Sequence, residues 1–217
     1  GIIYWIAYVI VNYGYLPLYV GISLMLLLAC YLSLYIAIFA GCVVYFRDKI
    51  PLYVTAPVLW VCLEYGKSFL LTGFPWENLG YSQYLNNYLI QFADVFGVFG
   101  LSFLIILVNA TIFEVLSRKS RKEYALAGLV FLIMASILFY GVYRVDQVNK
   151  IVRNAPGMEV SLIQGNIEQA IKWDKKYKTE TLNIYERLSL KNSQGNGSLI
   201  IWPETAVPFK FQVMNDL

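Results

Sequence analysis

The sequence contains no histidine and few charged residues. Charged side chains make up 14% of its 217 residues, whereas soluble domains carry about 25%. Without histidine, His-based catalytic triads and the commonest zinc ligand are excluded from this chain, and we expect neither a metal nor a cofactor. The net charge of +3 is small, so nothing indicates a nucleic-acid partner.

Long apolar runs take the place of the missing charges. No charged residue occurs before Arg47, and 59% of all residues are hydrophobic. Because about 20 apolar residues span a bilayer, the segment before Arg47 has room for more than one crossing. We therefore predict an integral membrane protein with a bundle of helices. They are formed by residues 18–46, by a helix from residue 51 or 54 to 71, and by the uncharged runs 95–113 and 124–143.

The sequence starts and stops abruptly. It begins with Gly1 inside an apolar stretch and stops seven residues after Lys210. We therefore expect a fragment that is truncated at both ends. Residues 1–11 are apolar and rich in aromatic side chains, and they are expected to form the tail of one helix or an arm at the membrane interface.

Cysteine is also scarce. Cys30, Cys42 and Cys62 all fall in apolar runs, where a thiol usually behaves as a buried small hydrophobe. We expect neither disulfides nor a catalytic nucleophile among them.

Two charged residues interrupt the predicted helix that ends at residue 71. Glu64 and Lys67 are three positions apart, which places them on one face of a helix, where they could pair. Ionisable groups inside a membrane helix are costly and are functional hypotheses by default. The alternative is that both lie near the helix end and reach the interface or each other.

Basic residues predict the orientation of the helices. Positive charges in short loops mark the cytoplasmic side of a membrane. Arg47 and Lys49 lie in one short loop and residues 118–122 in another, two crossings apart, so both fall on the same side. This parity places the loop of residues 72–83, and everything after Tyr143, on the extracytoplasmic side.

The composition becomes polar after the last apolar run. We expect a transmembrane region over residues 1–143, a linker over 144–157 and the first part of a soluble domain over 158–217. In that domain, residues 158–164 alternate as a strand does, and residues 179–190 read as an amphipathic helix. Residues 198–202 form an apolar strand expected to be buried on both faces. Strand, helix and strand predict a βαβ unit with a parallel pair.

Glu204 follows the second predicted strand. Open α/β sheets bind ligands just beyond the carboxyl ends of their strands, and Pro203 stiffens the chain at this point. A carboxylate held there is a reasonable general base. A structural Glu204 that caps the following turn or pairs with a lysine is an equally good interpretation of these residues alone.

Two segments resemble a known family. Residues 164–174 and, some thirty residues later, residues 201–208 with their Trp-Pro-Glu sequence are similar to apolipoprotein N-acyltransferases of bacteria. Trp-Pro-Glu alone would indicate only the wider nitrilase-like superfamily. The membrane half also resembles the family, so the likeness covers nearly the whole sequence; it is carried there by residues 31–35, 57–64, 71–76 and 80–83.

The resemblance implies a fold and a reaction. The fold would be a membrane α-helical bundle followed by the start of an α/β nitrilase-like domain, an αββα sandwich. The enzyme would move a fatty acyl chain from a phospholipid, through a Cys thioester, to the N-terminal diacylglyceryl-cysteine of a lipoprotein. Glu204 matches the catalytic Glu of a Glu, Lys and Cys triad. The family's Lys and Cys follow Leu217 in chain order, so residues 1–217 alone are expected to be inactive.

Three aromatic residues are candidates for substrate binding. Trp173 lies in a segment that matches a family loop near the active site, and Phe74 and Trp76 could shape the access of lipid between membrane and domain. Packing at the membrane interface is the alternative for all three. The resemblance implies a multi-pass protein of the bacterial inner membrane, with its soluble domain and its site on the periplasmic side, facing the bilayer that holds donor and acceptor.

Two other functions remain open. A membrane-tethered amidase or nitrilase would share Glu204 but would not need the match over residues 72–83 or so many helices. A transporter or membrane scaffold would be favoured by broken helices with several midplane charges, and only Glu64 and Lys67 come near that pattern.

Overall fold

The computed structural model describes residues 3–168, 172, 175–192, 199–204 and 206. The chain divides into two compact units, Gly1–Asn154 and Ala155–Leu217, and each is described by itself. The division falls inside the predicted linker of residues 144–157, while the predicted domain limits themselves stay a prediction.

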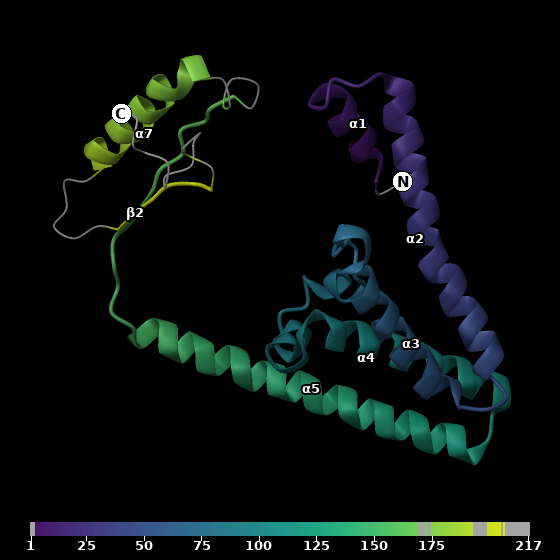
Figure 1. Ribbon diagram of the computed structural model, residues 1–217. Helices are drawn as coiled ribbons and strands as arrows, with labels where there is room; N and C mark the ends of the chain where they lie inside the picture. The colour runs from purple at the N-terminus through teal and green to yellow at the C-terminus, as the bar shows by residue number, and fades with distance from the viewer. Residues whose placement is uncertain (1–2, 169–171, 173–174, 193–198, 205, 207–217) are drawn as a thin grey trace. The chain divides into compact units, whose positions relative to one another are not determined.

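Long apolar helices dominate the first unit (Figure 1). Three helical segments of the described chain are long and apolar enough to cross a membrane: Leu18–Phe46, Leu89–Arg118 and Arg121–Asn154. Their large apolar side chains point outward, as shown by Leu27 and Phe131, which are 70% and 71% exposed. These helices confirm the predicted helical membrane region.

Helix α1 (Tyr4–Asn12) packs on α2 (Leu18–Phe46). Pro17 stands immediately before α2, where its fixed φ suits the start of a helix. Of the two expectations for residues 1–11, the structure shows a short helix.

Helix α3 (Leu52–Lys67) packs antiparallel to α4 (Ala93–Arg118). At one end the Leu52 amide donates to Glu114 Oε1 of α4 at 3.1 Å, and at the other end the chain beyond α3 bonds to Ser102 of α4. The α3 helix is about 24 Å long, shorter than the roughly 30 Å hydrocarbon core of a bilayer. The helix ends at Lys67 rather than at the expected residue 71, and a separate 3-10 turn, η1 (Leu70–Thr72), follows it. That α3 crosses the membrane stays a prediction.

Helix α4 is not straight. Gly97 has φ +63° and a non-helical ψ, and it breaks the helix near its beginning, a conformation that only glycine adopts cheaply. The predicted continuous run of residues 95–113 therefore contains a kink. Beyond it, Leu101 and Leu104 form the core of this unit with Ile137 of α5 and with Leu89 of the short 3-10 helix η3 (Leu89–Phe92).

Helix α5 (Arg121–Asn154) extends well past the apolar run that ends at Tyr143. The polar segment from residue 144, which we expected to be a linker, continues the helix to Asn154. No proline or glycine occurs in residues 144–155. Asp146 and Lys150, four residues apart, form an ion pair at 2.6 Å along its surface, which favours a helix.

The second unit is a small βαβ arrangement. Strand β1 (Val160–Leu162) pairs in parallel with β2 (Leu199–Ile201), with Ser161 opposite Ile200. Between them the chain forms the 3-10 turn η4 (Lys175–Tyr177) and helix α7 (Lys178–Asn192). The parallel pair and the amphipathic helix are both confirmed.

Helix α7 covers only one face of this pair. Tyr185 packs with Ile163 and Ala206, and Leu188 and Ile200 lie against this cluster. Leu199 and Ile201, which point to the opposite face, are 45% and 43% exposed. The expectation that the second strand is buried on both faces is therefore wrong for the described residues, because no second layer of them covers β2.

Candidate functional site

The loop of residues 71–80 connects α3 to the segment before α4, and its backbone is strained. Leu71 and Glu77 have φ of +51° and +61°, in the left-handed region that side chains other than glycine rarely adopt. Gly73 also has a positive φ, +84°. Such conformations persist only when surrounding contacts over-determine them, and they cluster at functional sites.

Helix side chains hold this loop through its backbone. Glu64 Oε1 accepts from the Leu79 amide at 2.6 Å, and Lys67 Nζ donates to the Trp76 carbonyl at 3.0 Å. The possible pairing of Glu64 with Lys67 is not seen: among the described ion pairs there is none between them. Each side chain instead bonds to a backbone group of the loop.

Helix α4 provides the third attachment. The Gly80 amide donates to Ser102 Oγ at 2.8 Å, and Ser102 is fully buried. A Cβ atom at Gly80 would lie 2.4 Å from the Val98 carbonyl oxygen, so only glycine fits at this distance from α4. The 71–80 loop is thus bonded to both α3 and α4.

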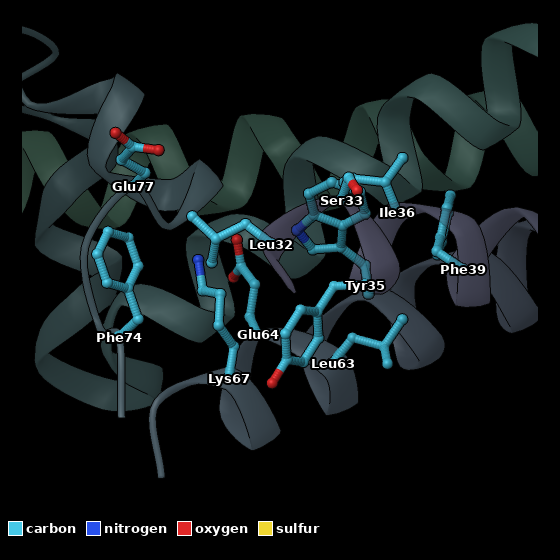
Figure 2. Close-up of a pocket in the computed structure, with 11 residues that line it drawn as sticks. Leu32, Ser33, Tyr35, Ile36, Phe39, Leu63, Glu64, Lys67, Phe74 and Glu77 are labelled. Carbon is cyan, nitrogen blue, oxygen red and sulfur yellow. The ribbon is translucent and has the colours of Figure 1, made fainter. Parts of the chain in front are cut away.

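A cavity of about 330 Å³ lies between α2, α3 and the 71–80 loop. Figure 2 shows Glu64 and Lys67 projecting from α3 into it, with Phe74 and Glu77 of the loop on one side. Most of the remaining lining is apolar or aromatic: Leu32, Tyr35, Ile36, Phe39, Trp60 and Leu63, with Ser33. An apolar cavity with a few polar groups is typical of a site for a small ligand.

Two polar atoms at this cavity have no hydrogen-bond partner among the described residues. They are Glu64 Oε2 and Trp60 Nε1, and both atoms are buried. One is an acceptor and the other a donor, so a polar ligand group or water in the cavity could satisfy either. In the described part of the chain no group of acidic or cysteine side chains could hold a metal ion.

The structure brings Phe74 and Trp76 together. Their ring centroids are 5.1 Å apart in an edge-to-face arrangement, and Trp5 of α1 lies 6.1 Å from Trp76 in the same way. Phe74 is buried at the cavity, whereas Trp76 is 57% exposed.

Glu204 lies just beyond β2, and its carboxylate is exposed. Trp202 is fixed before it, because its indole Nε1 donates to Ser189 Oγ at 2.8 Å and its ring stacks on Tyr185 at 5.2 Å. After it, the Ala206 amide donates to the Pro203 carbonyl at 3.1 Å and closes a turn. The contacts on both sides hold the backbone at Glu204, while its side chain is exposed.

The remaining predicted residues are placed less informatively. Trp173 lies outside the described residues. Cys30 and Cys62 are exposed and Cys42 is partly exposed, so the expectation of buried thiols is wrong. The physical reason is that these cysteines lie on outward faces of α2 and α3, which an apolar thiol can occupy where lipid rather than water is the surrounding medium.

Sequence reasoning missed the attachments of the 71–80 loop. Gly80 entered the sequence analysis only within the 72–83 loop and the resembling segment 80–83, and Ser102 lies inside an apolar helix with nothing to distinguish it from other serines. The one available signal was Glu64, an acidic residue in an apolar helix, and the sequence offered Lys67 and the membrane interface as its possible partners.

Comparison with known proteins connects both units to one family. The model of the apolipoprotein N-acyltransferase N-terminal domain matches residues 1–111. The apolipoprotein N-acyltransferase of Geobacter metallireducens is 43% identical over 219 residues, which cover 98% of this chain and 41% of that protein. The proteins of the same name from Pasteurella multocida and Haemophilus influenzae are each 36% identical, and their matches cover 94% of this chain and 39% and 38% of those proteins.

The chain thus spans about two fifths of the length of these relatives. The matches to the relatives include both the membrane helices and the βαβ unit, while the family model covers the helices up to Thr111 of α4. On this similarity, the chain belongs to the apolipoprotein N-acyltransferase family.

Proposed function

We propose that the full-length protein is an N-acyltransferase, which moves a fatty acyl chain from a phospholipid to the N-terminal diacylglyceryl-cysteine of a lipoprotein. The observation that carries the proposal is the position of Glu204, an exposed carboxylate held at the exit of a parallel strand. It lies in a chain that is 43% identical, over 98% of its length, to a protein named for this activity.

Glu204 acts as the general base of two successive steps. It first takes the proton of a Cys thiol; the thiolate attacks the acyl ester of the phospholipid, the ester C–O bond breaks, and Glu204 gives the proton to the oxygen of the departing lysophospholipid. Glu204 then takes a proton from the α-amine of the acceptor as it attacks the thioester, the C–S bond breaks, and the Cys thiolate leaves and is reprotonated by Glu204. A Lys stabilises the oxyanion of each step. In the family's order this Lys and Cys follow Leu217.

The proposed catalytic domain has the nitrilase-like αββα architecture. The parallel β1 and β2 strands with α7 on one face support this fold, because they supply the start of an α/β sheet. The exposed apolar side chains on the other face of β2, Leu199 and Ile201, are consistent with a further layer in that sandwich.

The membrane unit admits the lipid substrates. Phe74 and Trp76 stand beside a cavity with a largely apolar lining, and we assign to them the contact with phospholipid acyl chains. Trp173 is proposed to contact acyl chains on the side of the catalytic domain. The lipid bilayer itself delivers both donor and acceptor.

The site faces the periplasm from the inner membrane of a bacterium. Support comes from the antiparallel packing of α3 on α4: Leu52, which follows the basic loop at Arg47, lies beside Glu114 near the basic end of α4. The 71–80 loop bonds to Ser102, nearer the opposite end. Both basic segments therefore lie at one end of these helices, as the rule for cytoplasmic loops requires.

The test is acyl transfer by the full-length protein from a labelled phospholipid to a diacylglyceryl peptide. Glu204→Gln should lower the rate by about 10²–10⁴-fold, whereas Glu186→Gln, on an exposed position of α7, should not change it. An amidase would transfer no acyl chain, and a transporter or scaffold would be indifferent to Glu204→Gln. Residues 1–217 alone should be inactive, and transfer by them would contradict the assigned roles.

A further inference from the structure

We infer that Glu64 is the positioning residue of the 71–80 loop: its hydrogen bond to the Leu79 amide sets where Phe74 and Trp76 stand, and through them how well the phospholipid donor binds. The inference rests on the proposed function for the identity of the lipid substrate. It assigns to Glu64 a role that acts through the loop rather than on the reacting atoms.

The bond between Glu64 and Leu79 is short and buried. Its length is 2.6 Å, and Glu64 is 5% exposed. A hydrogen bond with an ionised acceptor is roughly twice as strong as one between neutral groups, and removal of the acceptor would leave a backbone donor without a partner in a partly buried place. This contact therefore has more influence on the loop than an exposed contact of the same length.

The loop needs such a contact because of its backbone. Leu79 is two residues after Glu77, whose φ of +61° is unfavourable for a side chain. The lysine contact to Trp76 is exposed, so it competes with solvent. Ser102 is a neutral acceptor for Gly80. The Phe74 amide also donates to the Lys67 carbonyl at 2.9 Å; among the three attachments made by side chains, Glu64 provides the only buried carboxylate.

The cost of burying Glu64 supports the same conclusion. A buried carboxylate in an apolar helix is expensive unless it is compensated. Here Oε1 is satisfied by the loop, while Oε2 has no partner among the described residues. A group that is only half satisfied is a poor stabiliser of the fold. Its retention is better explained by the geometry that it imposes on the loop beside the cavity.

The experiment compares two substitutions at Glu64 in the full-length protein. Glu64→Leu removes the acceptor, and Glu64→Gln keeps a neutral one. Two readouts are measured: kcat and KM for labelled phospholipid, and hydrogen–deuterium exchange of residues 74–83 by mass spectrometry. Asp48→Asn, an exposed acidic residue, is the control for loss of a negative charge.

We expect Glu64→Leu to raise KM about tenfold, with kcat within twofold, and to speed exchange in residues 74–83 about tenfold. Glu64→Gln should recover most of both, with KM within about threefold of the unmodified protein. Asp48→Asn should change neither. Unchanged KM and exchange in Glu64→Leu would overturn the inference. Equal damage in both Glu64 variants would overturn it as well, because a side chain that can still accept from the Leu79 amide would then fail to hold the loop.

A second variant guards against misfolding of Glu64→Leu. Leu79→Pro removes the same hydrogen bond from the donor side, at the first position of the 3-10 helix η2 (Leu79–Gln83), where proline is tolerated. Asn78 already has the extended ψ of 140° that suits a following proline. KM and exchange should rise as in Glu64→Leu, and unchanged values would reject the role of Glu64. Absence of any acyl transfer in the unmodified protein would refute the proposed function, while the exchange data would still test the loop.

Discussion

The 71–80 loop is held through its backbone by side chains of α3 and α4, whereas Glu204 owes its position to the strand and the turn on either side of it. In the first region the informative residues, Glu64 and Ser102, lie on helices distant in sequence from Gly80 and Trp76. In the second, Trp202 and Ala206 each lie two residues from Glu204, and Trp202 bonds to Ser189 of α7. A site whose own side chains stand in one short motif is visible in the sequence, and a site that depends on backbone groups held by side chains of other helices is not.

The largest effect is expected where the geometry of the carboxylate changes. Glu204→Asp shortens the side chain by one methylene, and misplacement by about 1 Å can cost roughly 10²-fold in rate. We expect kcat to fall about 10²-fold while KM for phospholipid stays within threefold, as measured by steady-state acyl transfer. Glu186→Asp on α7 is the control. A rise in KM with unchanged kcat would contradict the distinction between the two regions.

A smaller effect is expected from closing the space between the loop and α4. Gly80→Ala places a Cβ 2.4 Å from the Val98 carbonyl oxygen, which the backbone can relieve only by moving the loop. We expect KM to rise about tenfold with little change in kcat, because a shifted buried hydrogen bond costs of the order of 1–3 kcal/mol. The matched control is Gly128→Ala in α5, where an added Cβ meets nothing within 4 Å. If both variants behave alike, the loop does not determine lipid binding.

The smallest effect concerns the helix that leads out of the first unit. Asp94 of α4 accepts from Tyr140 and from Arg144 of α5, the latter at 3.0 Å, and both charged side chains are about one third exposed. Asp94→Asn should lower Tm by about 2–4 °C, because partly exposed ion pairs contribute about 1 kcal/mol or less. Asp48→Asn, whose pair with Arg47 is largely exposed, should leave Tm unchanged. A larger loss of Tm in the control would contradict this account of α5.

Much of the fold could be predicted because the signals are local. Uncharged runs of bilayer length indicated the helices α2, α4 and α5. Alternation indicated β1, helical spacing indicated α7, and a short apolar run indicated β2. Two details were not foreseen: the helix α5 continues through the polar residues after Tyr143, and Gly97 breaks the apolar helix α4.

The candidate site also contains residues that could be predicted from the sequence and residues that could not. Glu204, Phe74 and Trp76 could be proposed from motifs that contain them. The role of Glu64 could not be proposed, because its partner is the backbone amide of Leu79. Almost every residue has such an amide, so the residue type does not reveal the contact. For the same reason the sequence offered Lys67 as a possible partner of Glu64, although Lys67 bonds to the Trp76 carbonyl.

The central claim is that the two regions serve different parts of one reaction: Glu204 the chemistry, and the 71–80 loop the binding of lipid. The most direct measurement is kcat and KM for phospholipid in Glu204→Gln and Trp76→Ala, made side by side in the full-length protein. The account predicts a fall of about 10²–10⁴-fold in kcat for Glu204→Gln, and a rise in KM with kcat within about threefold for Trp76→Ala. A Glu204→Gln variant with unimpaired kcat, or a Trp76→Ala variant that loses kcat at unchanged KM, would contradict it.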